Sequence, residues 1–292
     1  MSVKKTGMSN PIRSILSAVA LGLSATPYAA NAQFGTESAK LSLVKVRDDV
    51  YVFQNPFVPG NTTAVITNEG VILVDDKFEI DHDNVVAMLK TVTSQPVRYV
   101  INTHYHADHS GGNAKLQAAG TLAVASSQAR QRMVEGNQPG LPDITVQPRG
   151  TVWLGGKSAE IYWLGRAHTD GDVVVLFPQS RVLAAGDMFT HGEGTPQLVD
   201  YRGGGSAKEW TATVENVLKL DFDTVVPGHG NVATKRELTA FRDGTKRFTE
   251  LVTQLVKQGK SRAEVEQAMR TEFGWQDFHV QSGLDGLIDE MK

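Results

Sequence analysis

The sequence has 292 residues, of which 40% are hydrophobic and 21% charged, and it contains no cysteine. A chain of this length can bury a sizeable core, and the lack of cysteine excludes disulfides and thiolate metal ligands. The chain has 29 basic and 32 acidic side chains, a net charge of −3, which argues against a basic nucleic-acid-binding surface.

The first 32 residues have the features of a secretory signal peptide. Three basic residues precede the apolar stretch 15–25, and Ala30-Asn31-Ala32 provides an Ala-x-Ala cleavage site. The apolar stretch is shorter than the roughly 20 residues that span a bilayer. We therefore expect the signal peptide to be cleaved, and we expect no stable membrane anchor. The remaining chain, 33–292, keeps 26 basic and 32 acidic side chains, a net charge of −6, and we expect it in the periplasm or secreted.

Strands and helices alternate along the remaining chain, which we expect to form a single domain. Apolar and β-branched runs predict strands, and apolar residues at helical spacing predict helices. In the first half we expect strands at 44–54, 63–67, 71–74 and 98–102, and helices at 81–93 and 114–119. The second half repeats this theme from Thr151 onward, and ends in a helix over 234–258 and another that Ser261 caps, to about residue 271.

Four potential metal ligands lie within six residues, at His104, His106, Asp108 and His109. Imidazole and carboxylate groups suit zinc or iron, and one short turn can provide ligands for two neighbouring ions. The chain has only eight histidines, so packing or solubility does not explain this concentration. The segment follows directly after a predicted buried strand, which indicates a metal-binding loop at the end of that strand.

Two ions need more ligands than one loop provides, and later strands are followed by suitable residues. His168 lies just before the predicted strand 173–177, Asp187 ends the apolar run 181–186, and His229 follows the run 224–227. We expect folding to bring these three side chains to the first loop.

The four motifs His-x-His-x-Asp-His, His-Thr-x-Gly-Asp, Gly-Asp and Pro-Gly-His occur in this order, and together the pattern resembles the metallo-β-lactamase superfamily of dinuclear metallohydrolases. The resemblance extends from about residue 44 to about residue 238. It implies an α/β fold, a four-layer αββα sandwich, here with extra C-terminal helices.

The resemblance also implies two Zn²⁺ ions per chain, with iron or manganese as alternatives. The first ion would bind three histidines, the second a mixed set, and one carboxylate would bridge both. The implied ligands are His104, His106 and His168 for the first ion, Asp108, His109 and His229 for the second, and Asp187 for both. Asp75, at the end of the strand 71–74, would support the metal loops without binding metal.

Two bound cations would lower the pKa of a shared water from about 15.7 toward roughly 7. Hydroxide would then be available to attack an amide, ester or lactone carbonyl. Asp108 would take a catalytic part by orienting the proton of this nucleophile. The expected protein is a zinc-dependent metallo-hydrolase acting on a small molecule, with β-lactams among the candidate substrates.

The residues that would select the substrate are less well defined by the sequence. β-Lactamases of the family generally have cysteine or serine at the position of Asp187, whereas an aspartate is similar to glyoxalase II and the lactonases. Some lactonases carry a tyrosine at the position of Thr190. Substrate-binding candidates lie around the glycine run 203–205 and after Asp187; they are Tyr201, Arg202, Lys208 and His191. His82 and His279 are expected to face solvent.

Two other classes of function remain alternatives. A persulfide dioxygenase-like oxidoreductase shares the histidine motifs but uses one iron, and a non-catalytic zinc-binding module would keep the ligands without turnover. The diiron electron-transfer relatives carry a glutamate at the position of His106, which argues against them.

Overall fold

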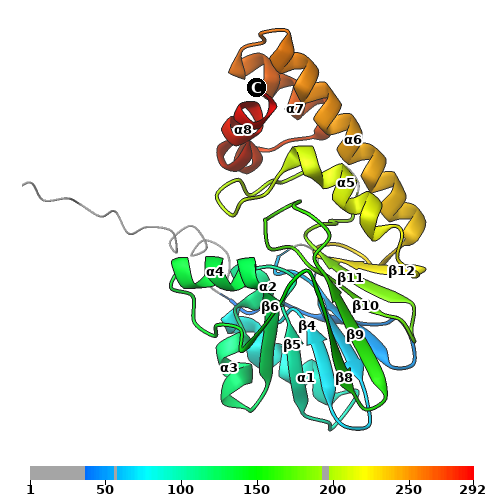
Figure 1. Cartoon of the computed structure of the whole chain (residues 1–292). Coiled ribbons are helices and arrows are strands. Elements are labelled where there is room, and N and C mark those ends of the chain that lie inside the picture. The colour runs from blue at the N-terminus through cyan, green and yellow to red at the C-terminus, as the bar shows by residue number, and fades with distance from the viewer. Residues whose placement is uncertain (1–36, 56–57, 193–196) are drawn as a thin grey trace, which may run out of the picture.

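Two β-sheets pack face to face, and helices cover both outer faces (Figure 1). The computed structural model describes residues 37–55, 58–192 and 197–292, so the expected signal peptide, 1–32, lies outside the described residues. The arrangement confirms the predicted αββα sandwich with extra C-terminal helices. None of the helices in the described ranges is both long and apolar enough to cross a membrane.

The first sheet has seven strands in chain order, antiparallel from β1 to β4 and parallel from β4 to β7. Its strands are β1 (Ser42–Lys45), β2 (Val50–Gln54), β3 (Thr62–Ile66), β4 (Val71–Val74), β5 (Val97–Ile101), β6 (Leu122–Ser126) and β7 (Ile144–Val146). The helical segments that connect its parallel strands are η2 (Glu79–Asp81), α1 (His82–Lys90), α2 (Ala107–Ser110), α3 (Asn113–Ala118) and α4 (Ser127–Glu135). The single strand predicted over 44–54 was wrong, because the chain turns at 46–49 and forms the hairpin β1–β2.

The second sheet has six strands in the order β13-β12-β11-β10-β9-β8, with only β11 and β12 parallel. Its strands are β8 (Arg149–Leu154), β9 (Lys157–Tyr162), β10 (Val174–Phe177), β11 (Val182–Gly186), β12 (Thr224–Pro227) and β13 (Ala233–Thr234). The helices on its outer side are α5 (Ala207–Val217), α6 (Lys235–Lys257), α7 (Arg262–Phe273) and α8 (Asp277–Met291). In Figure 1, α7 and α8 lie beside the upper part of α6, at the end of the molecule away from the first sheet.

The central strands are apolar on both faces because each face packs against a different layer. In β4, Ile72 and Val74 lie between the two sheets, while Val71 and Leu73 pack with the helices on the outer face. In β11, alternate residues are divided in the same way between the inter-sheet core and the α5–α8 core. A strand covered on both faces is expected to be an unbroken apolar run, as these strands are.

The parallel strands end at a common edge, and this edge positions the candidate site. Val74 of β4 is opposite Ile101 of β5, and Gly186 of β11 is opposite Pro227 of β12. The loop between β9 and β10 returns to the same edge, since β10 runs antiparallel to β11. The residues that follow these strands are therefore close in space although they are far apart in sequence.

The C-terminal helices begin with well-defined caps. Thr234 and Glu237 form a capping box at the start of α6, and Ser261 and Glu264 form another at the start of α7, as expected for a serine cap. The sequence did not predict the extent of α8, whose first turn is capped by Gln276 and His279.

His279 was expected to face solvent, and this expectation was wrong. The side chain is only 6% exposed, its Nδ1 accepts a hydrogen bond from the Gln276 backbone N–H (3.0 Å), and its ring stacks near Trp275. Burial lowers the pKa of His279 from 6.5 to about 4. His82, by contrast, is half-buried at the start of α1.

This low pKa predicts a specific loss of stability in acid. As the pH falls through 6.5, the unfolded chain binds a proton at His279 that the folded protein does not bind until about pH 4. The free energy of unfolding therefore decreases over that interval, by about 2 kcal/mol between pH 7 and 5. Denaturant unfolding of the wild type and His279→Gln should show this loss only in the wild type, since glutamine keeps the cap. An equal decrease in the free energy of unfolding of both proteins would contradict the low pKa of His279.

Candidate metal centre

The segment after β5 presents its ligands from a tight turn. His104 is fully buried, His106 lies at the N-terminus of α2, and α2 makes a single turn that carries Asp108 and His109. The helix α2 begins immediately after His106. His104 and His106 before it, and Asp108 and His109 within it, therefore lie at the same edge of the sandwich. The turn places the four predicted ligands next to one another.

Three histidines and one carboxylate form the first cluster. His106 Nδ1 lies 3.0 Å from His168 Nε2, and the ring of His104 lies 4.7 Å from that of His106, centroid to centroid. One potential ligand atom from each of His104, His106, His168 and Asp187 lies within 4.8 Å of the others. We refer to His104, His106 and His168 as the three-histidine cluster.

Asp108, His109 and His229 form the second cluster. The Nε2 atoms of His109 and His229 lie 3.3 Å apart, and Asp108 Oδ2 lies 3.5 Å from the first and 3.4 Å from the second. We refer to these three residues as the mixed cluster.

Asp187 lies between the two clusters. Its Oδ1 is 3.2 Å from His109 Nε2 and 3.3 Å from His229 Nε2, while its Oδ2 is 3.6 Å from His168 Nε2. One carboxylate therefore directs one oxygen toward each cluster. This position suits Asp187 to act as a ligand shared by the two clusters.

Two of these side chains, His104 and Asp187, have the properties expected of ligands to a cation. His104 Nε2 is buried and has no hydrogen-bond partner among the described residues, and burial holds the pKa of His104 well below its usual range. Burial opposes ionisation of Asp187, yet His229 and His109 hold its pKa well below the ordinary value. The unpartnered Nε2 of His104 and the ionised carboxylate of Asp187 are ligands of the kind that zinc binds.

Asp75, at the end of β4, orients two ligand histidines. Its Oδ2 lies 2.8 Å from His109 Nδ1 and also accepts a hydrogen bond from Thr103 Oγ1 (2.8 Å). Its Oδ1 accepts a hydrogen bond from the Thr103 backbone N–H (2.7 Å), and Thr103 Oγ1 in turn lies 3.2 Å from His104 Nδ1. Asp75 thus contacts His109 of the mixed cluster directly, and it contacts His104 of the three-histidine cluster through Thr103.

Asp200 plays the corresponding part for His106, and the sequence did not reveal it. Asp200 Oδ2 lies 2.9 Å from His106 Nε2 and accepts a hydrogen bond from the Tyr105 hydroxyl. Burial opposes its ionisation, but His106 and Tyr105 hold the pKa of Asp200 well below its usual range. Two residues earlier, the carbonyl oxygen of Leu198 accepts a hydrogen bond from His168 Nδ1 (2.7 Å). No motif marks this segment, because a backbone carbonyl and a loop aspartate have no signature in a single sequence.

The four substrate-binding candidates have different surroundings in the structure. The Tyr201 hydroxyl donates to Glu290 Oε2 in α8 (3.0 Å), and its ring packs against Gly286. Arg202 and Lys208 are exposed to solvent. His191 borders the mixed cluster through its backbone N–H, which donates to the His229 carbonyl, but its ring is close to Glu237 (Nε2 to Oε1, 3.3 Å).

The close packing of the glycine run 203–205 explains why these residues are glycines. A Cβ on Gly205 would lie 2.2 Å from the His168 carbonyl oxygen, and one on Gly203 would lie 2.4 Å from Asp200 Oδ2. The glycines allow this backbone to approach the His168 loop closely.

Gly60, in the loop between β2 and β3, lies directly against the ring of His109. Its carbonyl oxygen accepts a hydrogen bond from the fully buried Lys77 (2.5 Å), and a Cβ at Gly60 would lie 2.2 Å from His109 Cε1.

We expect Gly60→Ala to displace His109 and to weaken metal binding at the mixed cluster at least about tenfold. Metal titration should show this loss, whereas Gly244→Ala, where the added methyl meets open space, should bind metal normally. Equal metal affinity of the two variants would contradict this prediction.

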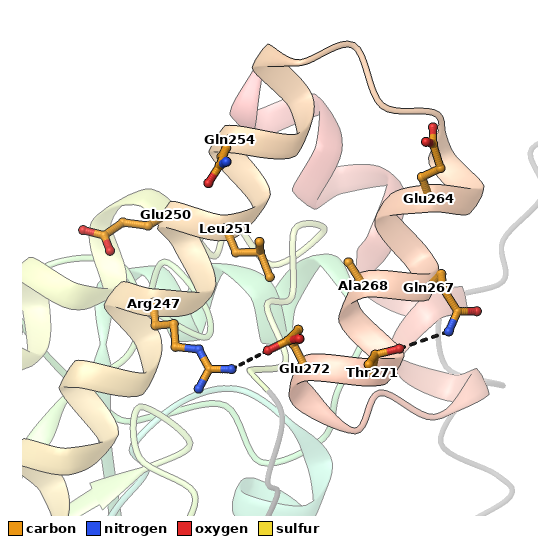
Figure 2. A pocket seen from close by; sticks show the side chains of 9 residues that line it. All are labelled: Arg247, Glu250, Leu251, Gln254, Glu264, Gln267, Ala268, Thr271 and Glu272. Atoms are coloured by element: carbon orange, nitrogen blue, oxygen red, sulfur yellow. Dashed lines mark hydrogen bonds and ion pairs between the residues drawn. The ribbon is translucent and has the colours of Figure 1, made fainter.

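A concave region lies between α6 and α7 (Figure 2). It is lined mainly by polar and charged side chains, and Arg247 pairs across it with Glu272 (2.6 Å). Its lining residues are Arg247, Glu250, Leu251, Gln254, Glu264, Gln267, Ala268, Thr271 and Glu272. None of them belongs to either metal-ligand cluster.

The fold and the paired clusters together define a metal-dependent hydrolase. The family model of the metallo-beta-lactamase superfamily matches residues 55–229, and the chain belongs to this family. The matched range contains both clusters and Asp187.

Similar proteins agree with this assignment. The chain is 28% identical over 209 residues to a metallo-beta-lactamase type 2 of Bacillus sp. (strain 170), covering 68% of this chain and 80% of the relative. It is 26% identical over 205 residues to a metallo-beta-lactamase type 2 of Elizabethkingia meningoseptica, covering 67% and 81%. A metallo-beta-lactamase from Pontibacter korlensis superposes with a TM-score of 0.64 at 25% identity, covering 71% of this chain and 99% of that structure.

Proposed function

We propose that the protein is a di-zinc hydrolase that cleaves an amide, ester or lactone bond of a small molecule. The observation that carries this proposal is the position of Asp187, with one carboxylate oxygen toward each cluster. The two clusters offer three further ligands each, all nitrogen or oxygen, which suits two zinc ions.

The residues of the site have distinct parts in such a reaction. Bound zinc ions supply a nucleophile at neutral pH and a positive centre for the developing oxyanion. Asp108 is partly exposed, so its carboxylate can accept the proton of the nucleophile as well as contact the metal. Asp75 and Asp200 hold the ligand rings in place, so that little reorganisation is needed during the reaction.

The proposed substrates are those that a carbonyl-directed hydrolase could accept. The similar proteins named metallo-beta-lactamase support β-lactams as one candidate. The aspartate at position 187 supports lactones and thioesters as the other candidates, because glyoxalase II and the lactonases have an aspartate at this position.

We further propose that the protein is exported, on the basis of the basic and apolar pattern of residues 1–32.

A turnover panel tests this proposal. Zinc-loaded protein is assayed with nitrocefin, acyl-homoserine lactones and thioesters, before and after removal of metal with EDTA. We expect hydrolysis of at least one substrate, its loss with EDTA, and its recovery when zinc is restored. Metal analysis of the same sample should give two zinc ions per chain.

The same panel separates the alternatives. One iron per chain with persulfide oxidation would replace the proposal by a persulfide dioxygenase-like function. Two bound zinc ions without EDTA-sensitive turnover of any substrate in the panel would instead favour a non-catalytic zinc-binding module.

A further inference from the structure

The segment 197–206 supports two of the three histidines in the three-histidine cluster. Asp200 contacts His106 Nε2, and the Leu198 carbonyl oxygen accepts a hydrogen bond from His168 Nδ1. The Asp200 backbone N–H also donates to the His168 carbonyl oxygen (2.8 Å). The position of this segment therefore determines the orientation of both rings.

Glu290, in the last turn of α8, binds the same segment at two points and the residue after it at a third. Its Oε2 accepts hydrogen bonds from the Tyr201 hydroxyl (3.0 Å) and from the Ala207 backbone N–H (2.9 Å). Its Oε1 accepts a hydrogen bond from Ser206 Oγ (2.6 Å). Ser206 caps α5, so a single carboxylate fixes both the middle and the end of the segment.

The face of α8 that carries Glu290 is shaped for this contact. Gly283, Gly286 and Glu290 are spaced three and four residues apart and so lie on one side of the helix. A Cβ at Gly286 would lie 2.4 Å from Tyr201 Cδ2, whereas one at Gly283 would make ordinary contacts of 3.7 Å or more. Glycine at position 286 is thus required for the ring of Tyr201 to lie against the helix.

We propose that α8 is a positioning element for the three-histidine cluster, acting through Glu290 and Gly286 on the segment 197–206. This inference rests on the proposed function, since it assumes that the cluster binds metal. The family model ends at residue 229, well before α8, so the family match assigns no role to this helix. Tyr201 in this view is a structural contact of α8 and not a substrate ligand.

Two variants test the proposal by different physical routes. Glu290→Ala removes three hydrogen bonds, and Gly286→Ala forces the Tyr201 ring to move while raising the helix propensity of α8. Each has a matched control on the same helix. Asp289→Ala removes the neighbouring exposed carboxylate, and Gly283→Ala adds a methyl group where there is room.

The measurement is metal affinity, with cadmium-113 NMR to distinguish the two sites and circular dichroism to check folding. We expect both variants to bind metal at the three-histidine cluster about tenfold more weakly, a loss typical of an indirect support, while the mixed cluster and both controls stay within about threefold of the wild type. If Glu290→Ala unfolds α8, the comparison of Gly286→Ala with Gly283→Ala decides the question.

Unchanged affinity of the three-histidine cluster in Gly286→Ala and in folded Glu290→Ala would overturn the positioning role and leave the proposed hydrolase intact. Wild-type protein that binds two metal ions but hydrolyses no substrate would overturn the proposed hydrolase instead. The affinity comparison would still test the role of α8 in that case.

Discussion

Replacing His106 with alanine is expected to remove at least one metal ion and nearly all hydrolysis, while the protein stays folded. The imidazole provides one of three nitrogens of its cluster, with Nδ1 3.0 Å from His168 Nε2. Its removal also leaves the partly exposed Asp200 carboxylate without its imidazole partner. We expect activity to fall by more than about a hundredfold, which is the upper end of the cost of losing an indirect support.

Metal analysis, the turnover panel and circular dichroism together measure this effect. His82→Ala is the control, because His82 is a half-buried histidine on α1 that belongs to neither cluster. His106→Ala protein with full metal content and full activity would show that the clusters are not the reaction centre.

Asp75→Ala is expected to weaken metal binding at both clusters, although Asp75 is not a ligand. Its carboxylate contacts His109 Nδ1 directly and fixes Thr103, which contacts His104. Loss of a carboxylate that orients ligand histidines typically costs 10- to 100-fold in metal affinity or activity. Because one substitution releases two rings, we expect an activity loss near the upper end, about a hundredfold.

Competition with a chelator measures the affinity of each site, and Asp83→Asn on the exposed face of α1 is the control. Asp75→Asn should show an intermediate loss, because the amide oxygen can still accept a hydrogen bond while the amide N–H₂ faces other donors. Loss of affinity confined to one cluster would contradict the shared role of Asp75.

The metal ligands could be predicted from the sequence because they follow the most regular parts of the fold. Asp75, Asp187 and His229 each come one or two residues after an apolar strand, and parallel strands end at a common edge. The turn 104–109 places four ligands by local geometry alone. Once the order of the strands is given, their ends bring the ligands of the two clusters together.

The residues that hold the ligand histidines in place, and the C-terminal helix α8, could not be predicted in the same way. Asp200 contacts His106 across 94 residues of sequence and Glu290 contacts its partners across 83 to 89, and no local pattern encodes these contacts. α8 carries Gly283 and Gly286, which lower helix propensity, and Gly286 is needed where Tyr201 packs closely. Tyr201 was predicted as a substrate-binding candidate, and no local pattern indicates that its hydroxyl donates a hydrogen bond to Glu290.

The central claim is that one carboxylate and six further side chains bind a pair of metal ions. Anomalous diffraction at the zinc edge, from crystals of zinc-loaded protein, tests it most directly. We predict two zinc peaks with Asp187 between them, one beside the three-histidine cluster and one beside the mixed cluster. A single peak, or zinc bound away from Asp187, would contradict the account.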